Sequence, residues 1–202
     1  MPRVSAAHLE ARRRQILEGA ARCFARDGFH ATSMQDVLKE TGLSAGAVYR
    51  YFPGKEAMIV DLAHSVLRAV GEVFEDASLA ERPPLPDAIL ANALTRATEL
   101  LAFPPSLVVQ VWAETVRSPE LAEVMREGLT GLVGHWQVIV ETYQRNGWMR
   151  ADVPAQHVAR TLAACAQGYL LQSALVGPLD TDVVVEGLRG IMSMNAPAAP
   201  TG

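Results

Sequence analysis

Helical periodicity runs through almost the whole of this 202-residue chain and limits the fold more than any other feature. Apolar residues recur every three or four positions, which is the spacing of a helix with one buried face. Alternating apolar and polar runs between turn signals, the pattern of strands, are nearly absent. Glycine, proline and capping residues break the periodicity into nine segments. The sequence therefore predicts an all-α fold of about nine helices.

The breaks also predict the domain organisation. We expect a three-helix N-terminal domain over 1–54, a helical bundle over 55–195 and a disordered tail over 196–202, where small residues and proline dominate. Helices are expected over about 8–27, 34–41, 45–51, 55–76, 87–103, 107–115, 119–145, 155–175 and 183–194. Ser33, Ser44 and Asp182 are the expected N-caps, because their side chains can accept hydrogen bonds from free backbone N–H groups.

Charge separates the same two parts of the chain. Half of all residues are hydrophobic, which is ample for a buried core, and the net charge is −4. Between Met1 and Lys55, nine basic and five acidic residues give a net +4. The remainder holds nine basic and seventeen acidic residues, a net −8. A basic head on an acidic body favours contact with a polyanion at one end only, although an ordinary solvated surface explains the charge equally well.

Several classes of protein are disfavoured. No apolar run approaches the roughly 18 residues needed to cross a bilayer, and the N-terminus lacks the uncharged core of a signal peptide. Cys23 and Cys165 lie far apart in apolar helical patterns, which favours reduced thiols and a cytoplasmic protein over a disulfide. The five histidines are scattered, and no metal-ligand pair, nucleophile motif or phosphate-binding glycine loop is present. We therefore expect no enzyme activity, no metal and no cofactor.

Two short helices joined by Gly42-Leu43-Ser44 are typical of a helix-turn-helix. Glycine permits the sharp turn, Leu43 can enter a core with Phe24, Val37 and Val48, and Ser44 can cap the second helix. That pattern alone is weak, because many helical bundles contain one.

The longer stretch 16–61 is much more specific. It reads ILEGAARCFARDGFHATSMQDVLKETGLSAGAVYRYFPGKEAMIVD and closely resembles the DNA-binding domain of the TetR/AcrR family of transcriptional regulators. The resemblance implies a homodimer that binds palindromic double-stranded operator DNA through a recognition helix beginning at Ser44. It implies DNA contacts by Thr32, Ser33, Gln35, Ser44, Ala45, Gly46, Ala47, Tyr49, Arg50 and Lys55, with Lys55 holding a phosphate.

Two positions depart from the family's pattern. Members often carry lysine or arginine where Ala45 stands, so specificity must depend on Arg50, Gln35, thymine methyl contacts or DNA shape. Leu38 stands where a small alanine is common, which affects how the second and third helices cross. Of Tyr49 and Tyr51, we expect Tyr51 to pack its ring inward.

The body resembles the family's effector-binding and dimerisation domain more loosely, with WAETVRSPELAEVMREGL and RNGWMRADVPAQHVARTLAACAQGYLLQ similar to the BetI type. Small and apolar residues at four-three spacing predict a four-helix dimer interface. The alternative is that these residues face the protomer's own core. The interface residues are Ala159, Ala163, Ala166, Leu170, Ser173, Val184, Leu188 and Ile191.

Large side chains on the body helices suggest an effector pocket, because such pockets are mostly apolar with a few polar anchors. Ordinary core packing remains the alternative for each. The candidates are Phe74, Phe103, Trp112, Met125, Trp136, Tyr143, Tyr169 and Gln172, with Gln110, Thr115 and His135 as further anchors. Glu114 or Glu141 could pair a cationic ligand, with a solvated acid as the alternative.

The function implied is that of a repressor, released from DNA when a small, largely apolar effector shifts the population of head spacings. Two rivals stay open: a small-molecule carrier that no longer reads an operator, and a regulator that senses a partner protein.

Overall fold

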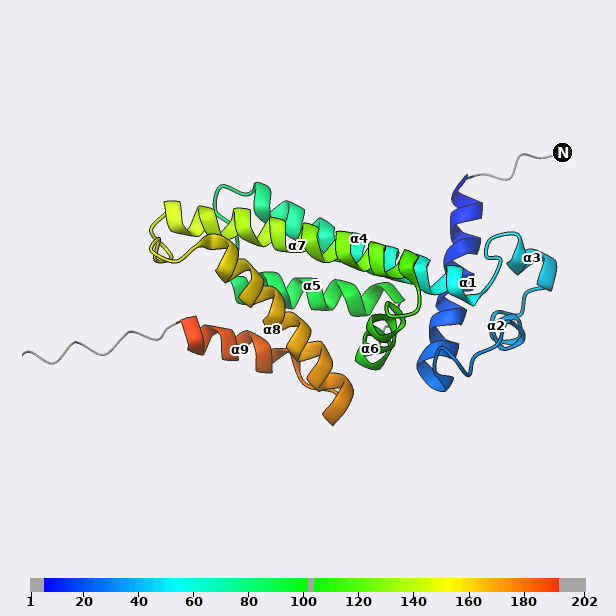
Figure 1. Ribbon diagram of the computed structural model, residues 1–202. Coiled ribbons are helices and arrows are strands. Elements are labelled where there is room, and N and C mark those ends of the chain that lie inside the picture. Colours follow the sequence, from blue (N-terminus) through cyan, green and yellow to red (C-terminus); the bar gives the residue numbers. More distant parts are fainter. Residues whose placement is uncertain (1–5, 102–103, 193–202) are drawn as a thin grey trace, which may run out of the picture.

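The computed structural model describes residues 6–101 and 104–192, and over these ranges it contains nine helices and no strand (Figure 1). The all-α prediction is therefore confirmed. Phe103 and the expected tail over 196–202 lie outside the described residues. The helices are α1 (Ala6–Asp27), α2 (Met34–Thr41), α3 (Ala45–Tyr49), α4 (Lys55–Leu79), α5 (Pro86–Leu101), α6 (Pro105–Glu114), α7 (Pro119–Arg145), α8 (Ala155–Val176) and α9 (Thr181–Met192).

Local capping fixes the ends of the short helices. Ser33 begins α2 in a reciprocal capping box with Asp36, and Ser44 accepts a hydrogen bond from the backbone N–H of Ala47 at the start of α3. Gly42 ends α2 at φ 67°, a left-handed conformation that a side chain would strain. The predicted N-cap of the last helix is wrong. Helix α9 begins at Thr181, and the side chain of Asp180, rather than that of Asp182, accepts a hydrogen bond from a backbone N–H in the first turn, that of Asp182.

Close approach of α1 and α2 depends on Gly19. A Cβ at Gly19 would lie 2.4 Å from the Thr41 side chain, so any other residue would force that side chain to move. Arg22 and Arg26 of α1 both pair with Glu40 of α2, at 2.7 and 3.3 Å. Helices α1 and α2 are thus held together by packing and by charge.

The body is an elongated bundle attached to the head through α4. The two longest helices, α4 and α7, lie side by side and run away from the head in the same direction (Figure 1). Helix α5 packs against α4, α8 packs against α6 and α7, and α9 packs against α5. None of the described helices is both long and apolar enough to span a membrane.

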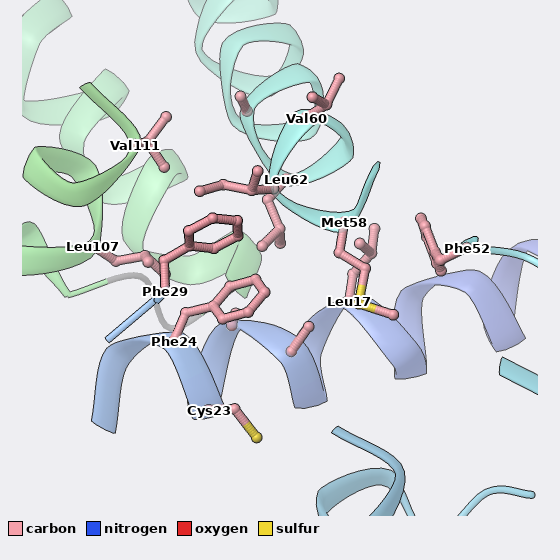
Figure 2. Packing of buried hydrophobic residues seen from close by; sticks show 14 of the residues in the cluster. Leu17, Cys23, Phe24, Phe29, Phe52, Met58, Val60, Leu62, Leu107 and Val111 are labelled. Carbon is pink, nitrogen blue, oxygen red and sulfur yellow. The ribbon is translucent and has the colours of Figure 1, made fainter. Parts of the chain in front are cut away.

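Two apolar cores organise the molecule. One joins head to body: Phe24 and Phe29 of the head meet Leu62 of α4 and Leu107 and Val111 of α6 (Figure 2). The other lies in the body around the buried residues Trp136, Tyr143 and Phe74. The expected boundary at residue 54 coincides with the start of α4, but the first core crosses it. The position of the head is therefore coupled by packing to α4 and α6.

Both cysteines are free thiols, as the sequence predicts. Cys23 is fully buried, and burial raises the pKa of its thiol. Because a buried, protonated thiol reacts slowly, we assign Cys23 a packing role in the core rather than a reactive role.

Candidate functional site

The turn between α2 and α3 packs against a buried apolar core. Val37 of α2 and Val48 of α3 are fully buried, and Leu43 of the turn packs against the same core as Phe24. Tyr51 also packs against this core, whereas the Tyr49 side chain is 49% exposed. The burial of one face fixes the orientation of α3 and leaves its other face open to solvent.

Most residues expected to contact DNA lie on this open surface. Gln35 is exposed in the first turn of α2, Arg50 is exposed at the end of α3, and Ala47 is half-buried. The other exposed members of the set are Ser33, Ser44, Ala45, Gly46 and Tyr49. The surface thus offers a phenol and a guanidinium beside small side chains, a combination that suits close approach to a DNA groove.

Thr32 and Lys55 lie differently from the rest of the set. Thr32 is 1% exposed, and its hydroxyl donates to the carbonyl of Gly28 at 2.8 Å. The Lys55 ammonium donates to the carbonyls of Phe29, His30 and Thr32 at 2.8, 3.1 and 3.0 Å. Both side chains are engaged with the α1–α2 loop, an arrangement that no sequence pattern indicates.

Some charged side chains of the head form ion pairs or hydrogen bonds within the protein and stabilise the head. Arg13 of α1 donates to Asp61 of α4 at 2.8 Å and lies over the Phe52 ring. The Ser33 hydroxyl and amide lower the pKa of Asp36, and the guanidinium groups that pair with Glu40 lower the pKa of that carboxyl. Arg14, Lys39 and Arg50 remain exposed. Internal pairing leaves the net +4 of the head unchanged, so it still attracts a polyanion.

The residues expected to line an effector pocket divide between the two cores. Phe74 and Trp136 pack edge to face at 5.0 Å in the body core, where the buried Tyr143 hydroxyl donates to the Pro84 carbonyl. Burial raises the pKa of Tyr143. Met125 and Trp112 belong instead to the core shared with the head. These five described residues therefore do not surround one common cavity.

The remaining pocket candidates have other partners. The Tyr169 hydroxyl donates to the Leu179 carbonyl at 2.8 Å, and Gln172 is exposed. Thr115 donates to the Trp112 carbonyl and His135 contacts Ser78 at 3.2 Å. Gln110 and Glu114 face the head, and Gln137 donates to Glu141 at 2.9 Å.

Two open cavities are present among the described residues. One, of about 300 Å³, lies between the α1–α2 loop and α6 and is lined by Phe29, His30, Gln110, Glu114 and Arg117, among others. The other, of about 470 Å³, lies between α4 and α5 and is lined partly by charged residues such as Glu72, Asp76 and Arg96. The sequence predicted neither cavity, although polar Gln110 and Glu114 on an otherwise apolar α6 were a usable signal.

Three of the eight residues expected at a dimer interface are buried within the protomer. Ala159 is fully buried, and Leu188 and Ser173 are each 5% exposed. Ala163, Ala166, Leu170 and Val184 are half-buried, and Ile191 is 67% exposed. Exposed apolar side chains on α8 and α9 include Ile191 of this expected set, and the others are outside it: Leu171, Leu175, Val176, Val183 and Met192.

A capped helix-turn-helix on a basic three-helix head, joined to a helical bundle, defines a class of DNA-binding regulators. Comparison with known proteins names the family. Residues 16–62 match the model of the bacterial regulatory proteins of the tetR family, and 105–191 match the C-terminal domain of BetI-type transcriptional repressors. The chain belongs to the TetR family.

Individual relatives agree with this assignment. The chain is 30% identical over 204 residues to the transcriptional repressor AcnR of Corynebacterium diphtheriae, covering 94% of this chain and 97% of that protein. Its fold is similar to that of Salmonella enterica GusR, with a TM-score of 0.71, 27% identity and coverage of 95% and 97%. PfmR of Thermus thermophilus shares the fold at a TM-score of 0.70 and 22% identity, covering 88% of this chain and 96% of its own.

Proposed function

We propose that this protein is a cytoplasmic transcriptional repressor that binds a palindromic operator as a homodimer and releases it when a small, largely apolar effector binds the body. The observation that carries the proposal is the exposed outer face of α3 on a head of net charge +4. The AcnR relative is itself described as a transcriptional repressor. A repressor acts by occupying DNA, and the exposed face of α3 is the surface proposed to do so.

The proposed contacts follow from position and chemistry. The N-terminal residues of α3, from Ser44 to Ala47, enter the major groove, and their small side chains let the backbone come close. Arg50 grips either a guanine edge or a phosphate, and the Tyr49 hydroxyl reaches a phosphate. Gln35 and the first turn of α2 approach a backbone phosphate of the same half-site. Base specificity then depends on Arg50, Gln35 and methyl contacts, because Ala45 brings no hydrogen-bonding group.

We propose that two protomers join through the exposed apolar face of α8 and α9. Leu175 and Val176 are 72% and 76% exposed, and Val183 and Ile191 are 59% and 67% exposed. Such residues gathered on two adjacent helices are unusual on a monomer's surface, and two helices from each protomer form a four-helix interface. Pairing would set the two heads one DNA turn apart, roughly 34–36 Å, as a palindrome requires.

The dimer proposal is tested by placing charge on that face. Leu175→Asp combined with Ile191→Asp should give a monomer in sedimentation equilibrium and bind operator DNA at least tenfold more weakly. Val116→Asp is the control, because Val116 is 88% exposed in the turn between α6 and α7, outside α8 and α9. A double variant that stays dimeric would place the interface elsewhere.

The effector proposal rests on the apolar body. Phe74, Trp136 and Tyr143 pack together among α4, α5, α7 and α8, the region in which the family resemblance places the ligand. In the described structure these side chains fill their own space, so an effector would bind by stabilising a more open body. A ligand that prefers that form shifts the population of head spacings by a coupling of about 1–3 kcal/mol, enough to release DNA.

The test of function is fluorescence anisotropy on DNA from upstream of the protein's own gene, with non-specific competitor and a salt series. Binding that survives competitor supports a specific regulator, and a screen of small apolar compounds for release then tests the effector. Binding abolished by competitor at every salt concentration would favour a carrier that no longer reads sequence. Absence of binding at low salt would contradict the proposal.

A further inference from the structure

We propose that the open cavity between α4 and α5, the α4–α5 groove, binds a small zwitterion, a molecule with an ammonium group, a carboxylate and a short hydrocarbon between them. The groove lies between the second half of α4, from Glu72 to Ala80, and the first half of α5, from Ala88 to Arg96. Its volume is about 470 Å³, within the range of ligand pockets in proteins. It opens on the surface, so it is separate from the buried core in which the effector is proposed to bind.

The floor of the groove is apolar. Ala77 of α4 and Ile89 of α5 line it and are 6% and 2% exposed, and Val73 beside them is half-buried. These side chains belong to the body core that contains Phe74 and Trp136. The floor is therefore the outer edge of a packed core. A hydrocarbon chain lying along it would be removed from water on one side, which favours binding.

The α4 wall of the groove favours a cation. Glu72 and Asp76 lie one turn apart on the same face of the helix, where like charges repel each other. Asp76 also stands in the last turn of α4, where the helix dipole disfavours a carboxylate and no basic residue is present. Among the described residues, the ion pair of Glu72 with Arg96, at 3.8 Å, is the only one that involves this wall. An ammonium between the two carboxylates would relieve their repulsion and neutralise Asp76.

The opposite wall favours an anion. It carries Arg96 of α5 and Arg82 of the loop that joins α4 to α5, residues 80–85, and both side chains are exposed. A guanidinium suits a carboxylate, because its planar N–H groups can bind both oxygens. Arg96 already pairs with Glu72, whereas Arg82 forms no ion pair with any residue that the structure describes. We therefore assign the carboxylate of the ligand to Arg82.

The loop that carries Arg82 is fixed by contacts with α7. It contains two prolines, whose rings restrict the backbone φ angle. The Tyr143 hydroxyl donates to the Pro84 carbonyl, and the side-chain amide of Asn146, just after α7, donates to the Glu81 carbonyl at 3.4 Å. The backbone beneath Arg82 is thus ordered before a ligand binds, which lowers the entropic cost of binding.

Both signs of charge around one groove select against singly charged compounds. A simple cation would be attracted by the two acids but repelled by the two arginines, and a simple anion would meet the reverse. A zwitterion satisfies both walls at once, with its ammonium between Glu72 and Asp76 and its carboxylate at Arg82. Its hydrocarbon then lies over Ala77 and Ile89 of the floor.

The class of ligand is tested with ω-amino acids of three to eight carbons, from 3-aminopropanoate to 8-aminooctanoate. Ligand-observed NMR titrations of the wild-type protein give the dissociation constants at low salt, where exposed charges are least screened. The amine and the carboxylic acid of equal chain length are the controls, since each keeps one of the two charges. The best zwitterion should bind at least tenfold more tightly than either control. Equal affinities, or no binding by any member of the series, would overturn the proposal.

Two neutralising variants test the two walls separately. Asp76→Asn should weaken binding of the zwitterion at least tenfold without weakening that of the carboxylic acid. Arg82→Gln should weaken the zwitterion to a similar extent without weakening the amine. Glu75→Gln is the matched control, because Glu75 is an exposed acid next to Asp76 that does not line the groove. An equal loss in Glu75→Gln would show that the overall charge of the body, rather than the groove, attracts the ligand.

Ala88→Phe tests the groove itself. Ala88 is exposed at its edge, so a phenyl ring there would occupy the groove without entering the core. Binding of the zwitterion should be lost while the melting temperature stays close to that of the wild type. Retained binding would place the zwitterion elsewhere and contradict the proposal.

The inference and the proposed function can fail separately, because none of these titrations needs DNA. A protein that binds an operator but no zwitterion would keep the proposed function and lose this site. A protein that binds the zwitterion in the groove but no operator would keep the site and lose the proposed function.

Discussion

The head and the body use polar and aromatic side chains in opposite ways. In the head, Tyr49 and Arg50 are exposed on a scaffold whose buried side is apolar. In the body, Trp136 and Tyr143 are about 1% exposed and pack into a core. The surface proposed to contact DNA is thus already formed in the head, whereas the proposed effector would require the body core to rearrange. A regulator of this design can combine a fixed DNA-reading surface with a body that responds to different compounds.

The largest effect should come from the body core. Trp136→Ala removes a buried indole that packs edge to face on Phe74, so it should lower the free energy of unfolding by about 3–5 kcal/mol. Trp148→Ala is the control, because Trp148 is 49% exposed and only stacks on Tyr143. Denaturant titration of both variants measures the difference. Comparable small losses would mean that the body core is not tightly packed around Trp136.

Substitution of an exposed residue of the head should weaken DNA binding and leave the stability of the protein nearly unchanged. Arg50→Ala should weaken operator binding by about 1–3 kcal/mol and change the free energy of unfolding by less than about 0.5 kcal/mol. Arg126→Ala on α7 removes an equally exposed charge from the body and should leave operator affinity unchanged. Anisotropy titrations, paired with thermal melts, distinguish the two effects. Equal binding losses in both variants would show that overall charge, rather than a head contact, attracts DNA.

A smaller effect is expected from the cap that starts α2. Ser33→Ala removes the acceptor of the Asp36 amide and should cost about 1 kcal/mol of stability. Because Ser33 caps the first turn of α2, the amides of that turn should also exchange faster with solvent. Ser33→Thr is the control, since threonine keeps the hydroxyl that caps the helix and donates to Asp36. Full stability in Ser33→Ala would show that packing alone fixes the start of α2.

The smallest effect is a pH dependence confined to the head. The pKa values of Asp36 and Glu40 are lowered in the folded protein, by hydrogen bonds from Ser33 and from Arg22 and Arg26. Their stabilising contribution is therefore complete above the unfolded pKa values of about 4 and is lost as the pH falls through the lower folded values. Head melting followed from pH 6 downwards should fall near and below pH 4, and less steeply in Asp36→Asn. Identical acid profiles would contradict this assignment.

Sequence reasoning succeeded where structure depends on neighbours along the chain. Ser33, Gly42 and Ser44 each act within one turn of their own position, so their roles follow from residue type and spacing. It is less informative where the outcome depends on which face of a long helix meets which neighbour. Ala159 and Leu188 repeat as an interface stripe would, but packing against the other body helices turns them inward.

The site of Lys55 shows a further limit. Its family position predicts a phosphate contact, and the structure adds hydrogen bonds to carbonyls of residues 23 to 26 positions earlier in the chain. No pattern of neighbouring residues in the sequence predicts a loop whose carbonyls converge on one point. Likewise, Gln110 bonds a residue 81 positions away, which helical periodicity on α6 cannot indicate.

The most direct test of the account is to compare two duplexes of equal length and base composition. One carries an operator that the wild-type protein selects from a random duplex pool, and the other carries a scrambled copy. Anisotropy titrations at near-physiological salt give the ratio of their dissociation constants. The account predicts a ratio of roughly 10³ or more, because specific regulators exceed their own non-specific binding by that factor. Equal affinity for both duplexes would contradict it, since the head would then attract DNA by charge alone without reading its sequence.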